Sequence, residues 1–281
     1  MNNDITFGKC DSGFFSCCII ILMNIIDYYN KYHKLPLKID TKKMLNVYQL
    51  YENHDVFEHC FYEKDITIDF KDKITFSKTN HEAQFSDYKK TNFDLILPFI
   101  EKYYNPTEPI QSKIIELKEK YNINNEKQYC GVFYRGNDKI KETQQPSYYE
   151  VTNKALELKK NNHDIIFIIQ TDEYEFLKHF LTIFPDSIYF TEIPVINKQM
   201  TTIAYVYQNN NNKLKILEYY IASIMIFSTL KHVICTSGNG EIFMCFFRKN
   251  ANGIIQYLKK NEYIYGCYNQ EYDSNELNVW F

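Results

Sequence analysis

The sequence predicts an α/β fold in which parallel strands alternate with covering helices. From residue 128 onwards, short apolar segments rich in β-branched and aromatic residues alternate with longer amphipathic segments. Strands are expected near 129–135, 164–170, 188–190 and 232–235, with helices near 147–160, 173–184, 214–227 and 241–249. This alternation is typical of a sheet covered on both faces, with the loops that follow the strands sharing one edge.

The first 125 residues read as a less regular α/β region. An apolar helix is expected at 17–32, ending before Lys34-Leu35-Pro36. Further helices are expected at 43–51, 93–104 and 110–121, and strands around Ile39 and within 65–76. The polar segment 122–127 is the expected linker, which predicts two domains at 1–125 and 126–281.

Composition and charge narrow the class of protein. Hydrophobic residues make up 45% of the 281 residues and charged residues 24%, which is ordinary for a globular protein. The net charge of −3 argues against a nucleic-acid partner. Neither a G-x-x-x-x-G-K-[ST] nor a G-x-G-x-x-G segment occurs, which disfavours P-loop kinases and dinucleotide-binding dehydrogenases.

The cysteines and the apolar runs predict a cytoplasmic protein. The eight cysteines lack C-x-x-C spacing, so buried reduced thiols are expected and no metal site. The apolar run Cys17–Ile26 is too short to cross a membrane, and no secretory signal opens the sequence. No transmembrane segment is therefore expected.

A charged loop follows the first strand of the regular half. Arg135 ends an apolar strand, and Asp138, Lys139 and Glu142 follow within a few residues, with turn-forming Gly136 between. Ligands of open α/β sheets bind at the carboxyl ends of strands. Because a guanidinium offers a fork of donors to anionic oxygens, Arg135 is the candidate phosphate ligand, with Lys139 as a second cation. A surface loop of paired charges is the alternative.

Two more polar loops follow later strands. Asp172 and Glu173 could accept hydrogen bonds from a base or a ribose, or could instead cap the next helix. The small, polar turn before the last predicted helix would allow close approach of phosphate to backbone N–H groups, or could be a plain cap; its members are Thr236, Ser237, Gly238 and Asn239.

Three segments resemble the α1,6-fucosyltransferases. Arg135-Gly136-Asn137-Asp138-Lys139 resembles their Arg-Arg-X-Asp-Lys signature, whose first Arg holds the β-phosphate of GDP-fucose. Ile168–Glu173 resembles their strand ending in Thr-Asp-Asp, and Val233–Asn239 resembles their strand ending in Cys-Thr-X-Ser-Ser. The resemblance covers residues 128 to about 260. Gly136 stands where the second Arg would be, and Phe133 stands where the family often has His.

The resemblance implies a GT-B-like fold, with two Rossmann-like halves facing a cleft. The chain is short for two full halves, which leaves room for a reduced N-terminal half on the acceptor side. The loop before the first helix resembles the family's glycine-containing loop that faces the donor, and Gly13 and Ser16 would occupy it. A plain helix N-cap, formed by Ser12 or Ser16, is the alternative reading of this loop.

The implied function is an inverting glycosyltransferase that needs no metal or other cofactor. It would move a sugar, fucose by resemblance, from a nucleoside-diphosphate donor such as GDP-fucose to a glycan hydroxyl. Glu142 resembles the family's base in position, and Asp138, Asp11 and His81 are the alternatives. A UDP-sugar donor and a non-catalytic nucleotide- or glycan-binding protein remain open as alternative functions.

Overall fold

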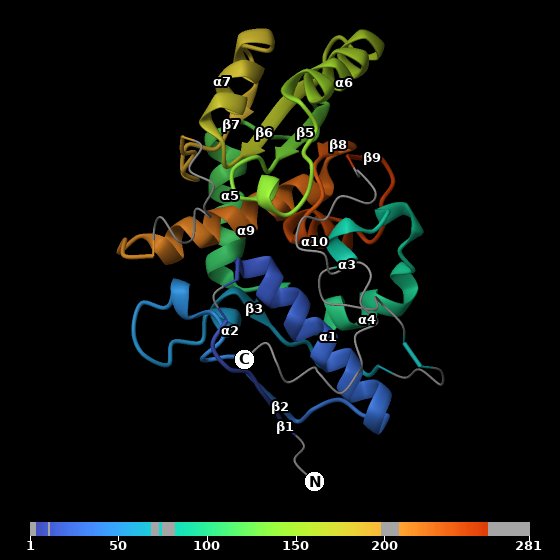
Figure 1. Cartoon of the computed structure of the whole chain (residues 1–281), viewed down its shortest axis with the longest axis vertical. Coiled ribbons are helices and arrows are strands. Elements are labelled where there is room, and N and C mark those ends of the chain that lie inside the picture. Colours follow the sequence, from blue (N-terminus) through green and yellow to red (C-terminus); the bar gives the residue numbers. More distant parts are fainter. Residues whose placement is uncertain (1–3, 11, 69–72, 75–81, 198–207, 258–281) are drawn as a thin grey trace.

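The computed structural model describes residues 4–10, 12–68, 73–74, 82–197 and 208–257 (Figure 1). Two of the alternative bases, Asp11 and His81, lie outside the described residues. The structure confirms the α/β class, because helices pack on both faces of a parallel sheet.

The parallel sheet has five strands in the order β7-β6-β5-β8-β9. Their bounds are β5 Tyr129–Tyr134, β6 Ile166–Thr171, β7 Ile188–Tyr189, β8 His232–Cys235 and β9 Ile254–Gln256. The first four were predicted to within about two residues, whereas β9 was not predicted. Gly131 lets β5 approach the helix beneath it, since a Cβ there would lie 2.6 Å from the Phe227 ring.

Helices cover the two faces of this sheet. α6 (Tyr148–Asn161) and α7 (Tyr174–Ile183) pack on the face that carries Val132 and Tyr134 of β5. α5 (Glu108–Lys120) and α9 (Lys213–Thr229) pack on the opposite face, where Phe133 meets Phe227 at a ring distance of 5.8 Å. Alternate residues of β5 are thus buried on both sides, as its continuous apolar sequence requires.

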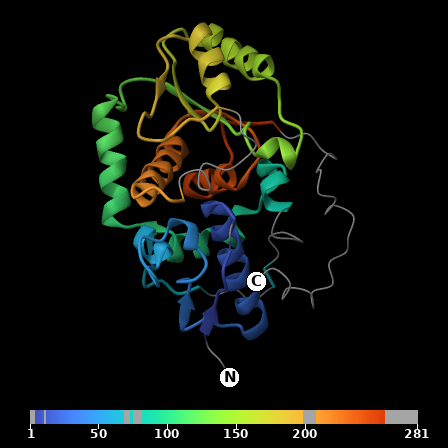
Figure 2. The ribbon, with the colours of Figure 1, turned by 60° about the vertical axis from the view of Figure 1, so that its left-hand side comes forward.

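The residues before α5 form the lower part of the molecule in Figure 1. Helices α1 (Phe14–Tyr32), α2 (Val56–Cys60), α3 (Glu82–Phe85) and α4 (Phe93–Tyr103) surround two small pairs of strands. These pairs are β1 (Asp4–Thr6) with β2 (Lys38–Asp40), and β3 (Phe61–Tyr62) with β4 (Asn105–Pro106). α5 then runs from this part to the sheet (Figure 2).

One expectation for the N-terminal region was wrong, and a second, the strand within 65–76, falls partly outside the described residues. The predicted helix at 43–51 is only a 3-10 turn, η1 (Asn46–Tyr48), because its apolar residues Met44, Leu45 and Tyr48 pack inward without continuous helical bonding. No strand occurs in the described parts of 65–76, which are 65–68 and 73–74. The helix α2 was not predicted.

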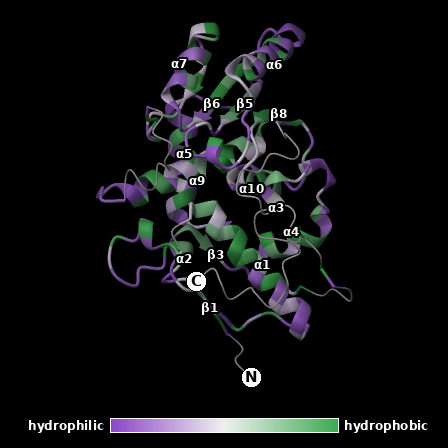
Figure 3. Ribbon diagram, viewed as in Figure 1, coloured by the Kyte–Doolittle hydropathy of each residue, from purple (hydrophilic) through white to green (hydrophobic). Residues whose placement is uncertain are grey.

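One hydrophobic core extends through both parts of the molecule. It contains most of α1 together with residues of α4, α9 and α10 (Asn239–Arg248). Phe243 of α10 lies 5.0 Å from the ring of Phe15 and 5.2 Å from that of Tyr104. Figure 3 shows α1 coloured as hydrophobic over much of its length, with hydrophilic residues toward its C-terminal end. Cys18, Cys60, Cys130, Cys235 and Cys245 are buried free thiols.

Candidate functional site

The candidate site lies where the strand order of the sheet reverses. β6 and β7 extend from one side of β5, whereas β8 and β9 extend from the other. Ligands of doubly wound sheets bind outside the carboxyl ends of the strands at this position. The loops after β5 and β8 meet there, because the Arg135 N–H donates to Thr236 Oγ1 at 3.2 Å and the Thr236 N–H donates to the Phe133 carbonyl at 3.0 Å.

Arg135 is held between two carboxylates. Its Nε donates to Asp172 Oδ2 at 2.7 Å, and its Nη2 donates to Asp138 Oδ1 at 2.8 Å. Burial opposes the charge, but Asp138 and Asp172 outweigh burial and raise the pKa of Arg135. Its side chain is 21% exposed. Arg135 and Arg248 are the chain's only arginines among 32 basic residues, and Arg248 binds backbone carbonyls elsewhere.

Asp172 joins the loops after β5 and β6. Besides Arg135 Nε, its Oδ1 accepts the backbone N–H groups of Gly136 at 3.1 Å and Asn137 at 3.3 Å. The side chain is buried, so these charged hydrogen bonds are shielded from water. Asp172, which the sequence placed as a reader of the base or ribose or as a helix cap, instead fixes the Arg135 loop.

Glu173 points inward, under the Arg135 loop. It is fully buried, and the Tyr148 hydroxyl donates to its Oε1. A Cβ on Gly136 would lie 1.8 Å from Glu173 Oε2 and 2.4 Å from the Tyr134 ring. The space of any side chain at position 136 is thus already occupied, which explains why glycine stands where the resembling family has a second arginine.

Lys139 and Glu142 form a half-buried ion pair in η3 (Lys139–Lys141) and the residue after it. Lys139 Nζ lies 2.5 Å from Glu142 Oε2 and 2.9 Å from Gln84 Oε1 of α3. Asp138 lies beside Arg135 and Lys139; although burial raises the pKa of its carboxyl, these two cations lower it by more, to below its ordinary value. Glu142 is the more accessible carboxylate, since 24% of its side chain is exposed against 14% for Asp138.

The turn after β8 is anchored from several sides. The Gly238 N–H donates to the Tyr88 hydroxyl at 3.0 Å, and Ser237 Oγ donates to the Tyr257 carbonyl at 2.9 Å. Asn239 Nδ2 donates to Ser16 Oγ of α1 at 2.9 Å. The structure therefore brings the predicted N-terminal loop to this turn. Gly13 precedes α1 as its N-cap residue, and a Cβ there would have no neighbour within 4 Å.

Three residues that the sequence did not single out complete the site. Gln84 and Tyr88, from α3 and η2 (Tyr88–Lys90), connect the Lys139 loop to the Gly238 turn. Glu241, in the first turn of α10, accepts a hydrogen bond from Thr236 Oγ1 at 3.0 Å. Glu241 could have been noticed in the sequence, because it is the one acidic residue of the largely apolar helix α10. No sequence pattern pointed to Gln84 or Tyr88.

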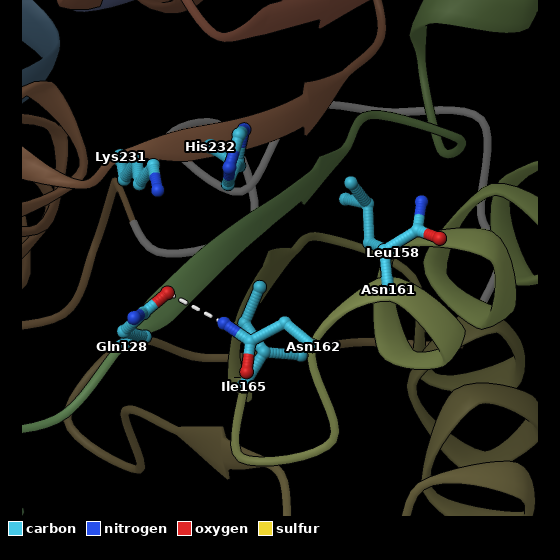
Figure 4. Close-up of a pocket in the computed structure, with 7 residues that line it drawn as sticks. All are labelled: Gln128, Leu158, Asn161, Asn162, Ile165, Lys231 and His232. Carbon is cyan, nitrogen blue, oxygen red and sulfur yellow. Dashed lines mark hydrogen bonds between the residues drawn. The ribbon is translucent and has the colours of Figure 1, made fainter.

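A separate cavity lies at the opposite edge of the sheet. Its volume is about 440 Å³, and residues from the amino ends of the strands line it, including Gln128 and His232 (Figure 4). Asn162 Nδ2 donates to Gln128 Oε1 at 2.5 Å beside it, and Leu158 and Ile165 add apolar surface. Because open α/β sheets bind ligands at the carboxyl ends of strands, this cavity is not the candidate site.

Comparisons with known proteins give fold neighbours and no sequence relatives. No protein-family model matches the chain, and no curated protein matches it. Two solved structures similar to it are NodZ alpha-1,6-fucosyltransferase co-crystallised with GDP and the same enzyme soaked with GDP-fucose. The first is 15% identical over 55% of this chain, with a TM-score of 0.37, and the second is 12% identical over 56%, with 0.36. The chain spans just under half the length of these proteins, 44% and 47%.

Two absences concern only the part of the chain that the structure describes. Within it, no group of three or more His, Cys, Asp or Glu residues is arranged to hold a metal ion. Among the same residues, none of the helices combines the length and the apolar character needed to cross a membrane.

Proposed function

We propose that this protein transfers a sugar from a nucleoside-diphosphate donor bound by the loops after β5, β6 and β8. The observation that carries the proposal is the position of Arg135. This arginine lies at the strand-order reversal of a parallel sheet, and its side chain is 21% exposed. Since a guanidinium has five N–H donors and the two carboxylates use two, donors remain for phosphate oxygens.

The surrounding loops supply the other features of a diphosphate site. The turn from Thr236 to Asn239 leads into the N-terminus of α10, where backbone N–H groups and the helix dipole favour anions. Lys139 adds a second positive charge on the same side as Arg135. Gly13 and Ser16 approach from α1 through the Asn239 contact, so the donor would lie between the two parts of the chain.

The finer assignment follows from the residues that resemble the α1,6-fucosyltransferases. On that basis the donor is GDP-fucose and the acceptor is a glycan hydroxyl bound on the side of residues 1–125. In an inverting step, the acceptor oxygen forms a bond to the anomeric carbon while the bond to the β-phosphate oxygen breaks. The diphosphate leaves with the electron pair, and Glu142 takes the acceptor proton. Asp138 is the alternative base among the described residues, though Arg135 holds it in the charged, weakly basic form.

A UDP-sugar donor is the second candidate within the same chemistry. Glu173, which the sequence placed as a reader of the base or ribose, is buried against Tyr148 and Gly136. Selection of the base therefore falls to residues other than this carboxylate. A thermal-shift comparison of GDP, UDP and their sugars separates the two donors, and donor hydrolysis without acceptor separates an enzyme from a binding protein.

The decisive experiment replaces Arg135. Arg135→Ala would remove the cation shared by Asp138 and Asp172. Arg135→Lys is therefore made as well, because it keeps the positive charge but loses the paired N–H donors of the guanidinium. Both should weaken nucleotide-sugar binding, by roughly tenfold to a hundredfold for a lost charged hydrogen bond worth about 1.5–3 kcal/mol. The affinity is measured by calorimetry on variants whose circular dichroism spectra show that they are folded like the wild type. Unchanged affinity in folded Arg135→Lys would contradict the proposal.

A further inference from the structure

Glu241 is a buried carboxylate that the proposed transfer does not use. It is 0% exposed, and its neighbours Ile242 and Phe243 belong to the core. Oε1 accepts the Thr236 hydroxyl at 3.0 Å, whereas Oε2 accepts no hydrogen bond from any residue that the structure describes. Oε2 lies directly against the turn from Thr236 to Asn239 (the phosphate turn), since a Cβ on Gly238 would be 2.5 Å from it.

The charges around this carboxylate do not suit an incoming diphosphate. The two cations of the site, Arg135 and Lys139, are outnumbered by five buried or half-buried carboxylates, which are Asp138, Asp172, Glu142, Glu173 and Glu241. The diphosphate of a nucleotide sugar adds two more negative charges. Like charges in a weakly screened interior repel strongly, and the carboxyl with the weakest support for its charge responds by binding a proton.

Three of the five carboxylates are bonded to a cation, whereas Glu173 and Glu241 each accept from a neutral hydroxyl. Asp138 and Asp172 are bonded to Arg135, and Glu142 is bonded to Lys139. Glu173 lies under Gly136, in the loop after β5, where the Tyr148 hydroxyl donates to it. Glu241 lies directly against Gly238 of the turn after β8, and among the described residues the neutral Thr236 hydroxyl is the only side chain that donates to it.

We propose, resting on the proposed donor site, that Glu241 takes up a proton when a nucleotide diphosphate binds and so neutralises the floor of the phosphate turn. Burial raises the pKa of the Glu241 carboxyl, and Arg135 and Lys139 oppose this increase. The other titratable groups that face it are Tyr88 of η2, Tyr220 of α9, Cys235 of β8 and Cys245 of α10. In these thiols and phenols burial raises the pKa, so they stay neutral near pH 7.

The sign of the resulting pH dependence follows from linkage. A proton that is bound more tightly in the complex makes donor affinity fall as pH rises between the free and the bound pKa of Glu241. Where uptake is complete, the affinity should fall about tenfold per pH unit. Glu241 acts through Thr236 and the backbone turn and does not reach the donor, so it is a positioning residue.

Calorimetry with intact GDP-fucose and UDP-glucose tests this inference, because their diphosphate diesters do not titrate near neutrality. Wild-type protein is titrated across the neutral range in buffers of different ionisation enthalpy. We expect uptake of up to about one proton per donor bound. Glu241→Gln should abolish the uptake and flatten the pH dependence. Glu157→Gln, on the exposed face of α6, is the matched control and should retain both.

Each outcome decides between the two proposals. If neither nucleotide sugar binds the wild type, the donor site fails and this inference fails with it. Binding without proton uptake, or uptake that persists in Glu241→Gln, overturns this inference alone. If Glu241→Gln does not fold, Thr236→Val is measured in its place. The Thr236 hydroxyl lowers the pKa of Glu241, so its loss should move the pH range of proton uptake upward. An unchanged pH range would overturn the proposal.

Discussion

At the scale of single residues, the site is defined by how tightly Arg135 and its loop are packed. The guanidinium and two backbone N–H groups converge on Asp172, and Glu173 fills the space under Gly136. This loop therefore matches Arg-Arg-X-Asp-Lys at Arg135, Asp138 and Lys139 and departs from it only at Gly136. Glu173 and Gly136 fit together, because any side chain at position 136 would overlap the Glu173 carboxylate.

Gly136→Ala should destabilise the protein because the added methyl group would overlap Glu173 and Tyr134. Overpacking of this kind costs about 1–3 kcal/mol. Gly13→Ala is the control, as a Cβ at that position meets nothing within 4 Å. Denaturant unfolding of both variants measures the difference in the free energy of unfolding, and equal stability of the two would contradict the described position of Glu173.

The carboxylates of the candidate site also bear on whether sugar transfer would need a metal ion. The carboxylates of the site are engaged with Arg135, Lys139, Thr236 or Tyr148 and are not gathered for Mg²⁺ or Mn²⁺. Sugar transfer should therefore persist in EDTA, with the two cations carrying the charge of the leaving diphosphate. An assay with and without chelator checks this, and full loss that Mn²⁺ restores would contradict it.

At the scale of elements, the site is the meeting point of loops from distant segments. The loop after β5, the turn before α10 and the α3–η2 segment are connected through Lys139, Gln84 and Tyr88. The start of α1 joins them through Ser16. Motion of any one of these segments would alter the others, so substitutions in α3 or η2 should act on donor binding without contacting the donor.

The short element η3 carries the candidate base. Glu142→Gln should lower sugar-transfer turnover by about 10²–10⁴ while donor affinity changes little, because a neutral amide cannot accept the acceptor proton. The matched control is Glu157→Gln, whose carboxylate forms an ion pair with Lys154 at the same spacing and distance as Glu142 with Lys139. Steady-state rates and calorimetric affinities make the comparison. Near-normal turnover in Glu142→Gln would assign this carboxylate to ion pairing alone and direct the search to Asp138, Asp11 and His81.

At the scale of the whole molecule, the two parts of the chain share their core. Buried residues of α1 and α4 belong to the same apolar cluster as those of α9 and α10, and Phe15 contacts Phe243. This shared cluster crosses the expected domain boundary near residue 125, and the division into acceptor and donor sides stays a prediction.

Expression of residues 126–281 alone tests the independence of the donor side. The fragment would lose α5, which packs with α9 on one face of the sheet, and would expose the apolar side of α10. We expect it to unfold without cooperativity or to aggregate, whereas the full chain should show a single cooperative transition. Circular dichroism during denaturation distinguishes these results, and a cooperative transition in the fragment would instead establish two independently folding domains.

The sequence by itself determined the α/β class, the first four strands of the sheet and the loops that form the site. These features are local: continuous apolar runs predict buried strands, and the polar residues after them fall on one edge because parallel strands have the same direction. Arg135, Asp172 and Thr236 could be found in this way, since each directly follows or nearly follows a strand.

Only the tertiary structure decided which side chains meet. β9, the short helix α2 and the 3-10 turn at 46–48 depend on packing partners far away in the sequence, which outweigh their weak local preferences. The contacts of Gln84 and Tyr88 with loops 55 and 150 residues away leave no local pattern. The inward position of Glu173 and the buried carboxylate of Glu241 likewise depend on the space under Gly136 and Gly238, which exists only once the strands are assembled.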